Sequence, residues 1–176
     1  MRTKIWKTAT LVLATVLITL MTHSAIARHI AGTTVSGTSI TAVKVVRETA
    51  SNETTSTSYV NLPGASTTIT VPTGQKALIL ARFSAESVCY AGQQGHWCSV
   101  RILVGGVQAE PADGLDFGFD SVEADQFLYE SHSMDRSRGP LSAGSYLVRV
   151  QVAVTLSSVV FRLDDWSLTV ERVRVP

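Results

Sequence analysis

The chain has 176 residues, of which 45% are hydrophobic and 16% are charged, and its formal net charge at pH 7 is +1. This length suits a single domain. A chain so close to neutral lacks the strongly basic surface that nucleic acids and anionic membranes require, so neither is expected to be its main partner.

Residues 1–27 have the features of a secretory signal peptide. Three basic residues precede an apolar run from Ala9 to Met21, and the Ala25-Ile26-Ala27 triplet has the small-x-small pattern of a cleavage site. The run is shorter than the stretch of about 20 residues that spans a bilayer. We therefore expect cleavage after Ala27, a secreted or periplasmic protein, and no stable membrane anchor.

The mature chain is predicted to consist of a spacer and one β domain. Residues 28–40 are rich in Ser, Thr and Gly, which favours a flexible spacer. Residues 41–176 form the domain, in which short stretches alternate apolar and polar side chains as half-buried strands do. These stretches are 41–49, 59–62, 66–71, 126–134 and 145–156, with further strands in 77–111. After the signal no stretch shows a sustained helical period.

Two strand patterns in the second half of the chain are informative. In 126–134, Phe127 and Tyr129 share one side. Near the C-terminus, apolar residues alternate through Phe161 and Leu163, but the phase shifts by one before Trp166. One extra residue at Asp164-Asp165 would produce this shift, which predicts a β-bulge there.

The pattern as a whole predicts an all-β fold. About eight to ten short strands separated by Gly, Pro, Ser and Asn turns are typical of an antiparallel β-sandwich. Two long connections, at residues 112–125 and 135–144, favour a jelly roll over a simple meander.

Cys89 and Cys98 are predicted to form one disulfide, because an exported chain matures under oxidising conditions. If the two cysteines lie opposite each other on antiparallel strands, Tyr90 faces Trp97 across the same pair of strands. Aromatic cross-strand pairs of this kind stabilise sheets.

The same register predicts a row of charges. It places Glu86 opposite Arg101, and the pair Gly105-Gly106 predicts a tight turn that returns the chain to place Glu110 beside Arg101. We therefore expect a three-stranded meander over residues 77–111. The row is expected to be a solvated ladder of charges, and its alternative use is as the carboxylates of a small glycan hydrolase.

Several stretches resemble a known group of proteins. SYLVRVQVAV, FRLDDWSLTVERV, YVNLPGASTTITVPTG and ALILARFSAES resemble small exported bacterial β-sandwich proteins of uncharacterised function. More distantly, the strand layout is similar to the jelly-roll heads of C1q/tumour-necrosis-factor-like proteins and to phage tail-fibre tips. Kinship to the C1q-like proteins would imply trimers, although the chain has no collagen-like repeat. The resemblance covers roughly residues 43–175 and transfers no functional residue.

The segment between the cysteines is the predicted ligand site. Two aromatic side chains next to each other can stack on a sugar ring, and neighbouring amides can bond its hydroxyls. The residues are Tyr90, Gln93, Gln94, His96 and Trp97. The disulfide would hold this loop rigid and lower the cost of ordering it on binding. The alternative is that the two rings only cover the disulfide.

A cluster of acidic side chains offers a weaker metal hypothesis. Oxygen ligands of this kind suit calcium, although their spacing does not match an EF-hand loop. The residues are Asp113, Asp116, Asp120, Glu123 and Asp125. Otherwise no cofactor is expected.

The sequence favours binding over catalysis, because the nucleophile-elbow, metalloprotease, phosphate-loop and dinucleotide motifs are all missing. The predicted function is a secreted, non-enzymatic binding module for an extracellular or cell-surface glycan. A structural or adhesive protein that self-associates through a half-apolar sheet face, as a homo-oligomer, is the first alternative. A small glycan hydrolase is the second.

Overall fold

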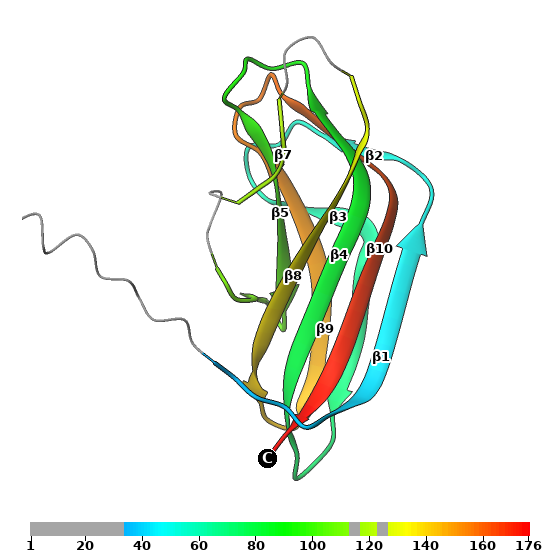
Figure 1. Cartoon of the computed structure of the whole chain (residues 1–176), viewed down its shortest axis with the longest axis vertical. Coiled ribbons are helices and arrows are strands. Elements are labelled where there is room, and N and C mark those ends of the chain that lie inside the picture. The colour runs from blue at the N-terminus through cyan, green and yellow to red at the C-terminus, as the bar shows by residue number, and fades with distance from the viewer. Residues whose placement is uncertain (1–33, 113–116, 123–126) are drawn as a thin grey trace, which may run out of the picture. The chain divides into compact units, whose positions relative to one another are not determined.

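The protein is described from a computed structural model that covers residues 34–112, 117–122 and 127–176. These residues form ten strands and no helix, arranged as two antiparallel sheets that face each other (Figure 1). No helix among them is long and apolar enough to cross a membrane. The predicted signal peptide lies outside the described residues.

Sheet A has four strands in the spatial order β1, β10, β4 and β8, with a short fifth strand on the edge of β10. Their bounds are β1 (Ser39–Glu48), β10 (Val160–Val175), β4 (Lys76–Tyr90), β8 (Glu130–Leu141) and β2 (Asn52–Thr54). β1 starts inside the segment that was predicted as spacer. β2 lies between the predicted strands 41–49 and 59–62, where no strand was predicted.

Sheet B has the order β3, β9, β5 and β6, with a short strand on β5. Their bounds are β3 (Val60–Val71), β9 (Gly144–Val154), β5 (Trp97–Val104), β6 (Val107–Gln108) and β7 (Gly118–Ser121). The sequence predicted two strands where the structure has β3 alone. The register of β3 shifts between Asn61 and Ser66, around Pro63-Gly64, so the two predicted strands are one strand with an irregularity between them.

The pairing order confirms the predicted jelly roll. Early strands pair with late ones, β1 with β10, β3 with β9 and β4 with β8, as in a long hairpin rolled into two sheets. One of the two long connections that favoured this prediction, at residues 135–144, is not a loop, however. Residues 135–144 are mostly strand rather than loop, because β8 continues to Leu141 and leaves a short turn before Gly144. Its apolar alternation is interrupted by Arg136 and Arg138, which hid the strand.

The core lies between the sheets and is formed by alternate side chains of both. Phe83 and Trp166 of sheet A are at most 1% exposed, and their ring centroids lie 6.2 Å apart. Ile102 and Val150 oppose them from sheet B and are fully buried. Burying a large apolar side chain stabilises a fold by about 1.5–3 kcal/mol, so this layer holds the sheets together.

The disulfide is confirmed, but its geometry differs from the prediction. Cys89 and Cys98 are bonded, with a Cα–Cα distance of 5.9 Å. They do not lie on neighbouring strands, because β4 pairs with β10 and β8, whereas β5 pairs with β9, β6 and β7. The disulfide therefore joins sheet A to sheet B, and the three-stranded meander does not exist.

The second predicted hairpin is confirmed at its turn. Val104 pairs with Val107, and the Ala109 amide donates to the Ile102 carbonyl at 2.9 Å. Gly105 and Gly106 have φ values of 59° and 80°. Both values lie in the left-handed region that glycine adopts without steric cost, so the Gly-Gly pair forms the expected tight turn.

The β-bulge near the C-terminus is also confirmed. Asp164 pairs with Glu86 and Ser167 with Ser84, so two residues of β10 oppose the single Ala85 of β4. Asp165 has a φ of 42° and its side chain is exposed. The extra residue returns Trp166 to the core side of the sheet.

Candidate functional site

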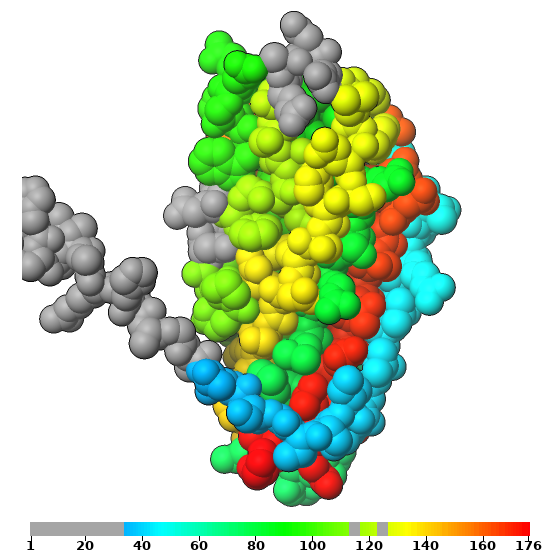
Figure 2. Space-filling view, viewed as in Figure 1, coloured from blue at the N-terminus to red at the C-terminus, as the bar shows by residue number. Residues whose placement is uncertain are grey.

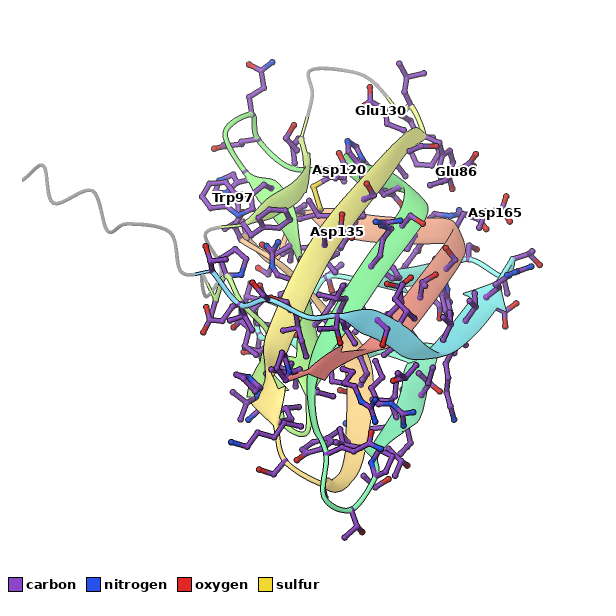
Figure 3. The ribbon with its side chains drawn as sticks, turned by 60° about the horizontal axis from the view of Figure 1, so that its bottom comes forward. Glu86, Trp97, Asp120, Glu130, Asp135 and Asp165 are labelled. Atoms are coloured by element: carbon purple, nitrogen blue, oxygen red, sulfur yellow. A yellow bond between two sulfur atoms is a disulfide. The ribbon has the colours of Figure 1, made fainter. Side chains whose placement is uncertain are left out.

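The predicted aromatic pair is separated by the sandwich. Cys89 and Cys98 point into the core, and neighbouring side chains of a strand point to opposite faces. Tyr90 therefore lies on the outer face of sheet A and Trp97 on the outer face of sheet B. Their strand partners are Val160 and Ser121. Figure 3 shows Trp97 on the opposite side of the domain from Glu86, another outward residue of β4. The predicted pairing of Tyr90 with Trp97 was wrong.

The remaining predicted ligand residues lie in the β4–β5 loop, residues 91–96. Gln93 and Gln94 are exposed, and His96 Nδ1 lies 3.2 Å from Thr155 Oγ1. The Trp97 ring lies over Gly118, where an added Cβ would come 3.5 Å from it. The loop therefore does not place the two rings and the amides on one surface.

Backbone strain in this loop gives a stability prediction. Ala91 has a φ of 62°, a conformation that costs a residue with a side chain roughly 1–2 kcal/mol. We expect Ala91→Gly to raise the free energy of unfolding by about 0.5–1 kcal/mol, measured by urea denaturation, because glycine removes the clash but loses more entropy on folding. Gly95→Ala is the matched control. Gly95 has a φ of 88° and open space around it, so the change in stability should have the opposite sign.

The predicted charge row is not formed either. Glu86 lies on sheet A between Ser131 and Asp164. Arg101 lies on sheet B, where its Nε donates to Gln151 Oε1 at 2.8 Å and its guanidinium lies 3.9 Å from the centroid of the Tyr59 ring. The predicted row required β4 and β5 to be neighbours in one sheet. They lie in different sheets, so the row does not form.

Glu110 pairs instead with the edge of sheet A. Its backbone exchanges two hydrogen bonds with Ser137 of β8, at 2.7 and 2.9 Å. The half-apolar face predicted for self-association required four apolar residues to lie on one sheet face: Leu78, Leu80, Val88 and Leu103. The first three are on sheet A, where Leu78 and Val88 are buried, and Leu103 is on sheet B.

A different aromatic cluster is assembled on the outer face of sheet A. The Tyr90 and Phe127 ring centroids lie 4.7 Å apart at 79°, and those of Phe127 and Tyr129 lie 5.7 Å apart at 88°. Phe127 is 52% exposed and Tyr129 is 37% exposed. We call Tyr90, Phe127 and Tyr129 the aromatic patch. Edge-to-face packing of this kind is favourable and fixes the relative angles of the rings.

Charged and polar groups border the aromatic patch. Glu53 Oε1 accepts a hydrogen bond from the Tyr90 hydroxyl at 3.3 Å and lies 3.4 Å from Arg162 Nη1. Arg162 Nη2 donates to Ser51 Oγ at 3.2 Å, and its guanidinium carbon lies 5.8 Å from the centroid of the Tyr129 ring. Desolvation, together with the negative charge of Glu53, raises the pKa of the Tyr90 hydroxyl above its ordinary value. The hydroxyl therefore stays protonated at neutral pH and remains a donor.

Part of this patch was visible in the sequence. Phe127 and Tyr129 were predicted to share one side, and Tyr90 was already a predicted ligand residue. The Tyr90–Phe127 contact joins positions 37 apart in the chain, one on β4 and one in the segment before β8, which is not strand although residues 126–134 were predicted as one. The neighbouring Glu53 comes from β2, a strand that the sequence did not predict. No local pattern could have found this arrangement.

The acidic cluster is described only in part. Asp113, Asp116, Glu123 and Asp125 lie outside the described residues. Asp120 is on β7, where its carboxylate accepts hydrogen bonds from the Ser121 amide at 2.7 Å and from Ser87 Oγ at 2.7 Å. Within the described part of the chain no three acidic, His or Cys side chains are arranged to hold a metal ion. Calcium binding therefore stays a prediction.

Ser87 is the buried end of a polar network that the sequence did not predict. Ser87 Oγ lies 3.0 Å from His132 Nδ1, and His132 Nε2 lies 3.5 Å from Glu130 Oε2. The contacts combine a serine, a histidine and carboxylates, as in hydrolases. Ser87 is fully buried, however, and its hydroxyl donates to Asp120. The Ser87 hydroxyl is therefore not exposed to solvent, and its contacts link β4, β7 and β8.

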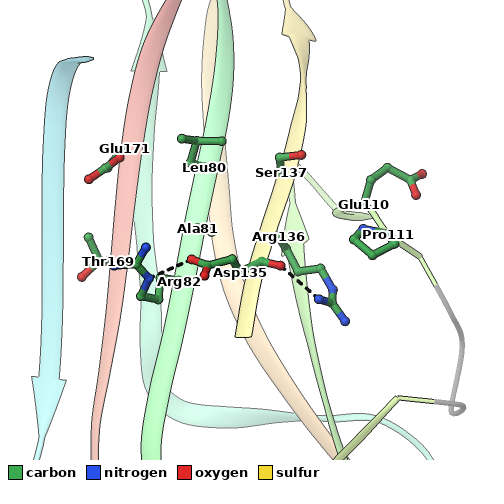
Figure 4. A pocket seen from close by; sticks show the side chains of 10 residues that line it. All are labelled: Leu80, Ala81, Arg82, Glu110, Pro111, Asp135, Arg136, Ser137, Thr169 and Glu171. Carbon is green, nitrogen blue, oxygen red and sulfur yellow. Dashed lines mark hydrogen bonds and ion pairs between the residues drawn. The ribbon is translucent and has the colours of Figure 1, made fainter. Parts of the chain in front are cut away.

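A hollow of about 400 Å³ lies on the outer face of sheet A near the Glu110 backbone pair (Figure 4). Leu80 and Pro111 provide its apolar surface, and Arg82 and Asp135 cross it as an ion pair at 2.8 Å. Both partners are more than 60% exposed, so water screens the pair and it contributes little. Charges of both signs line the hollow, and they favour no particular ligand.

Comparisons with known proteins leave the function open. No family model and no curated protein sequence matches the chain. Among solved structures, the chain is similar to dimeric latent PorU from Porphyromonas gingivalis, with 15% identity and a TM-score of 0.37. The match covers 81% of this chain and 14% of that one, so the chain spans about one seventh of that protein. A likeness this weak says nothing about function.

Proposed function

We propose that the protein is a non-enzymatic binding module for an extracellular or cell-surface glycan, and that the aromatic patch is its binding surface. The observation that carries the proposal is the contact of the Phe127 ring with both Tyr90 and Tyr129, while Phe127 itself is 52% exposed. Clustered exposed apolar side chains on a soluble domain mark interaction surfaces.

The chemistry of the patch suits a sugar. The apolar C–H face of a pyranose can stack on an aromatic ring, while its hydroxyls need hydrogen-bonding groups at the edge of that ring. Glu53, Arg162 and the Tyr90 hydroxyl supply an acceptor and donors there. The rings already hold one another, so little side-chain entropy is lost on binding.

Substitution of Phe127 tests this proposal. Phe127→Ala removes the central ring of the patch, so we expect the dissociation constant for the bound glycan to rise about tenfold or more. The melting temperature should change little, because the side chain is exposed. The measurement is affinity electrophoresis through gels that contain xylan, β-glucan, alginate or soluble chitin fragments, with thermal melting in parallel.

Two control variants locate the site. Leu128→Ala removes an adjacent exposed side chain that carries no aromatic ring, and Trp97→Ala removes an aromatic ring on the other sheet. Both variants should keep the wild-type mobility. Retardation lost only in Trp97→Ala would place the glycan on sheet B and disprove the aromatic patch. A wild-type protein that no polysaccharide or glycan array retains would overturn the function.

A further inference from the structure

A second exposed apolar surface lies along β1. The side chains of Ile40, Val43 and Val45 are 56%, 55% and 46% exposed; we call them the edge strip. β1 forms one edge of sheet A, and among the described residues it pairs with β10 alone. Figure 2 shows the atoms of β1 beside those of β10 at the margin of this face. A ten-residue edge strand with exposed valines leaves backbone donors and acceptors ready to pair with another strand.

A second copy of the same chain is one strand that β1 could accept. If two β1 strands pair antiparallel about a twofold axis perpendicular to the sheet, the outer face of one copy continues into the outer face of the other. Paired residues must then point to the same face of the joined sheet. The axis therefore lies midway between the two copies of one residue, which pairs with itself.

The charges on β1 select the register. An axis at Lys44 would oppose two lysines, and an axis at Arg47 would oppose two arginines, both of which are unfavourable. An axis at Val46 places Lys44 opposite Glu48 of the second copy, and the symmetry repeats this pair. Lys44 and Glu48 are exposed, and Glu48 uses Oε1 to accept the Thr49 and Ala50 amides, which leaves Oε2 for the pair.

We propose that the protein forms a homodimer in which β1 pairs with β1 of a second copy, with Val46 at the twofold axis. In this register the two Val45 side chains are diagonal neighbours on the outer face, and the alkyl stem of Arg47 covers each of them. One strand pair buries less surface than a standard protein interface. The dimer therefore dissociates on dilution. The proposal is independent of glycan binding.

A charge-swap experiment tests the dimer without any ligand. Lys44→Glu and Glu48→Lys each convert two attractive pairs into two repulsive ones, and we expect each to weaken dimerisation about tenfold or more. The double variant K44E/E48K restores both pairs with the signs exchanged and should recover dimerisation to within about threefold of the wild type. Sedimentation equilibrium of the purified protein at low ionic strength measures the dissociation constants.

The controls separate pairing from misfolding. Lys76→Glu makes the same charge change at the exposed start of β4 and should leave the dissociation constant unchanged. Circular dichroism melting of every variant reports whether the monomer folds. A wild type that stays monomeric up to about 1 mM would overturn the proposal. So would a dimer that all the charge variants leave intact, or a double swap that fails to recover dimerisation while remaining folded.

Discussion

Replacing Cys89 and Cys98 together by alanine is expected to lower the free energy of unfolding by about 2.5–3 kcal/mol. The cysteines are nine positions apart, and in the chain-entropy model the stabilisation depends on the length of the closed loop. That length is the same whether the disulfide lies within one sheet or between two. Urea denaturation followed by tryptophan fluorescence, compared with the parent protein, measures the change.

Amide exchange distinguishes a disulfide between the two sheets from one within a single sheet. Here the disulfide joins strands that share no hydrogen bonds, so its loss should speed amide exchange at both Tyr90 and Trp97, one on each sheet. The Gly105-Gly106 turn follows the other end of β5 and serves as the internal control, because its exchange should not change. An unaltered unfolding midpoint would contradict the assigned role of the disulfide.

The disulfide also shows which properties could be predicted from the sequence and which could not. The existence of the bond was predicted from two cysteines in a chain with a predicted export signal. Its place did not follow, because a short loop between two strands can close a hairpin within one sheet or cross from one sheet to the other. Both arrangements satisfy the alternation of β4 and β5. The assumption of one sheet then produced the Tyr90–Trp97 pair and the Glu86-Arg101-Glu110 row, and both predictions were wrong for the same reason.

Properties that depend on one strand or one turn were predicted well. The Gly-Gly turn and the bulge before Trp166 are local, and each is determined by a few neighbouring residues. The aromatic patch depends instead on which strands share a sheet, and that is decided by packing over the whole chain. β8 was also misjudged, because Arg136 and Arg138 replace apolar residues on its inner side. The Arg136 guanidinium carbon lies 4.3 Å from the centroid of the Phe117 ring, and its Nη1 donates to the Asp135 carbonyl, so the buried charge has partners in the protein.

The two proposals are geometrically compatible. Both the aromatic patch and the edge strip lie on the outer face of sheet A, and a twofold axis perpendicular to that sheet keeps the outer faces of both copies on one side. A dimer would therefore present two patches to the same surface. Binding of one patch raises the effective concentration of the other, which strengthens attachment to a surface that displays many glycans.

Deleting Ser167 is expected to lower the free energy of unfolding by about 5 kcal/mol or more, whereas deleting Asp165, two residues earlier, should be tolerated. Without Ser167 the chain has two options. If it keeps the bulge, Leu168 and Val170 turn out of the core. If it loses the bulge, Trp166 turns outward and the Asp165 carboxylate turns inward. All three apolar residues are at most 1% exposed, so either option costs a large share of the stability of a typical domain.

Deletion of Asp165 removes only the extra residue. Asp164 then still faces outward beside Glu86, and Trp166 follows opposite Ala85 with its ring in the core. The left-handed conformation at Asp165 is lost with it, which offsets part of the cost of losing the local bend. We expect a folded protein within about 1–2 kcal/mol of the parent, measured by urea denaturation with tryptophan fluorescence. If the Ser167 deletion variant is as stable as the parent, or the Asp165 deletion variant is unfolded, the bulge at Asp165 does not decide which side chains of β10 face the core.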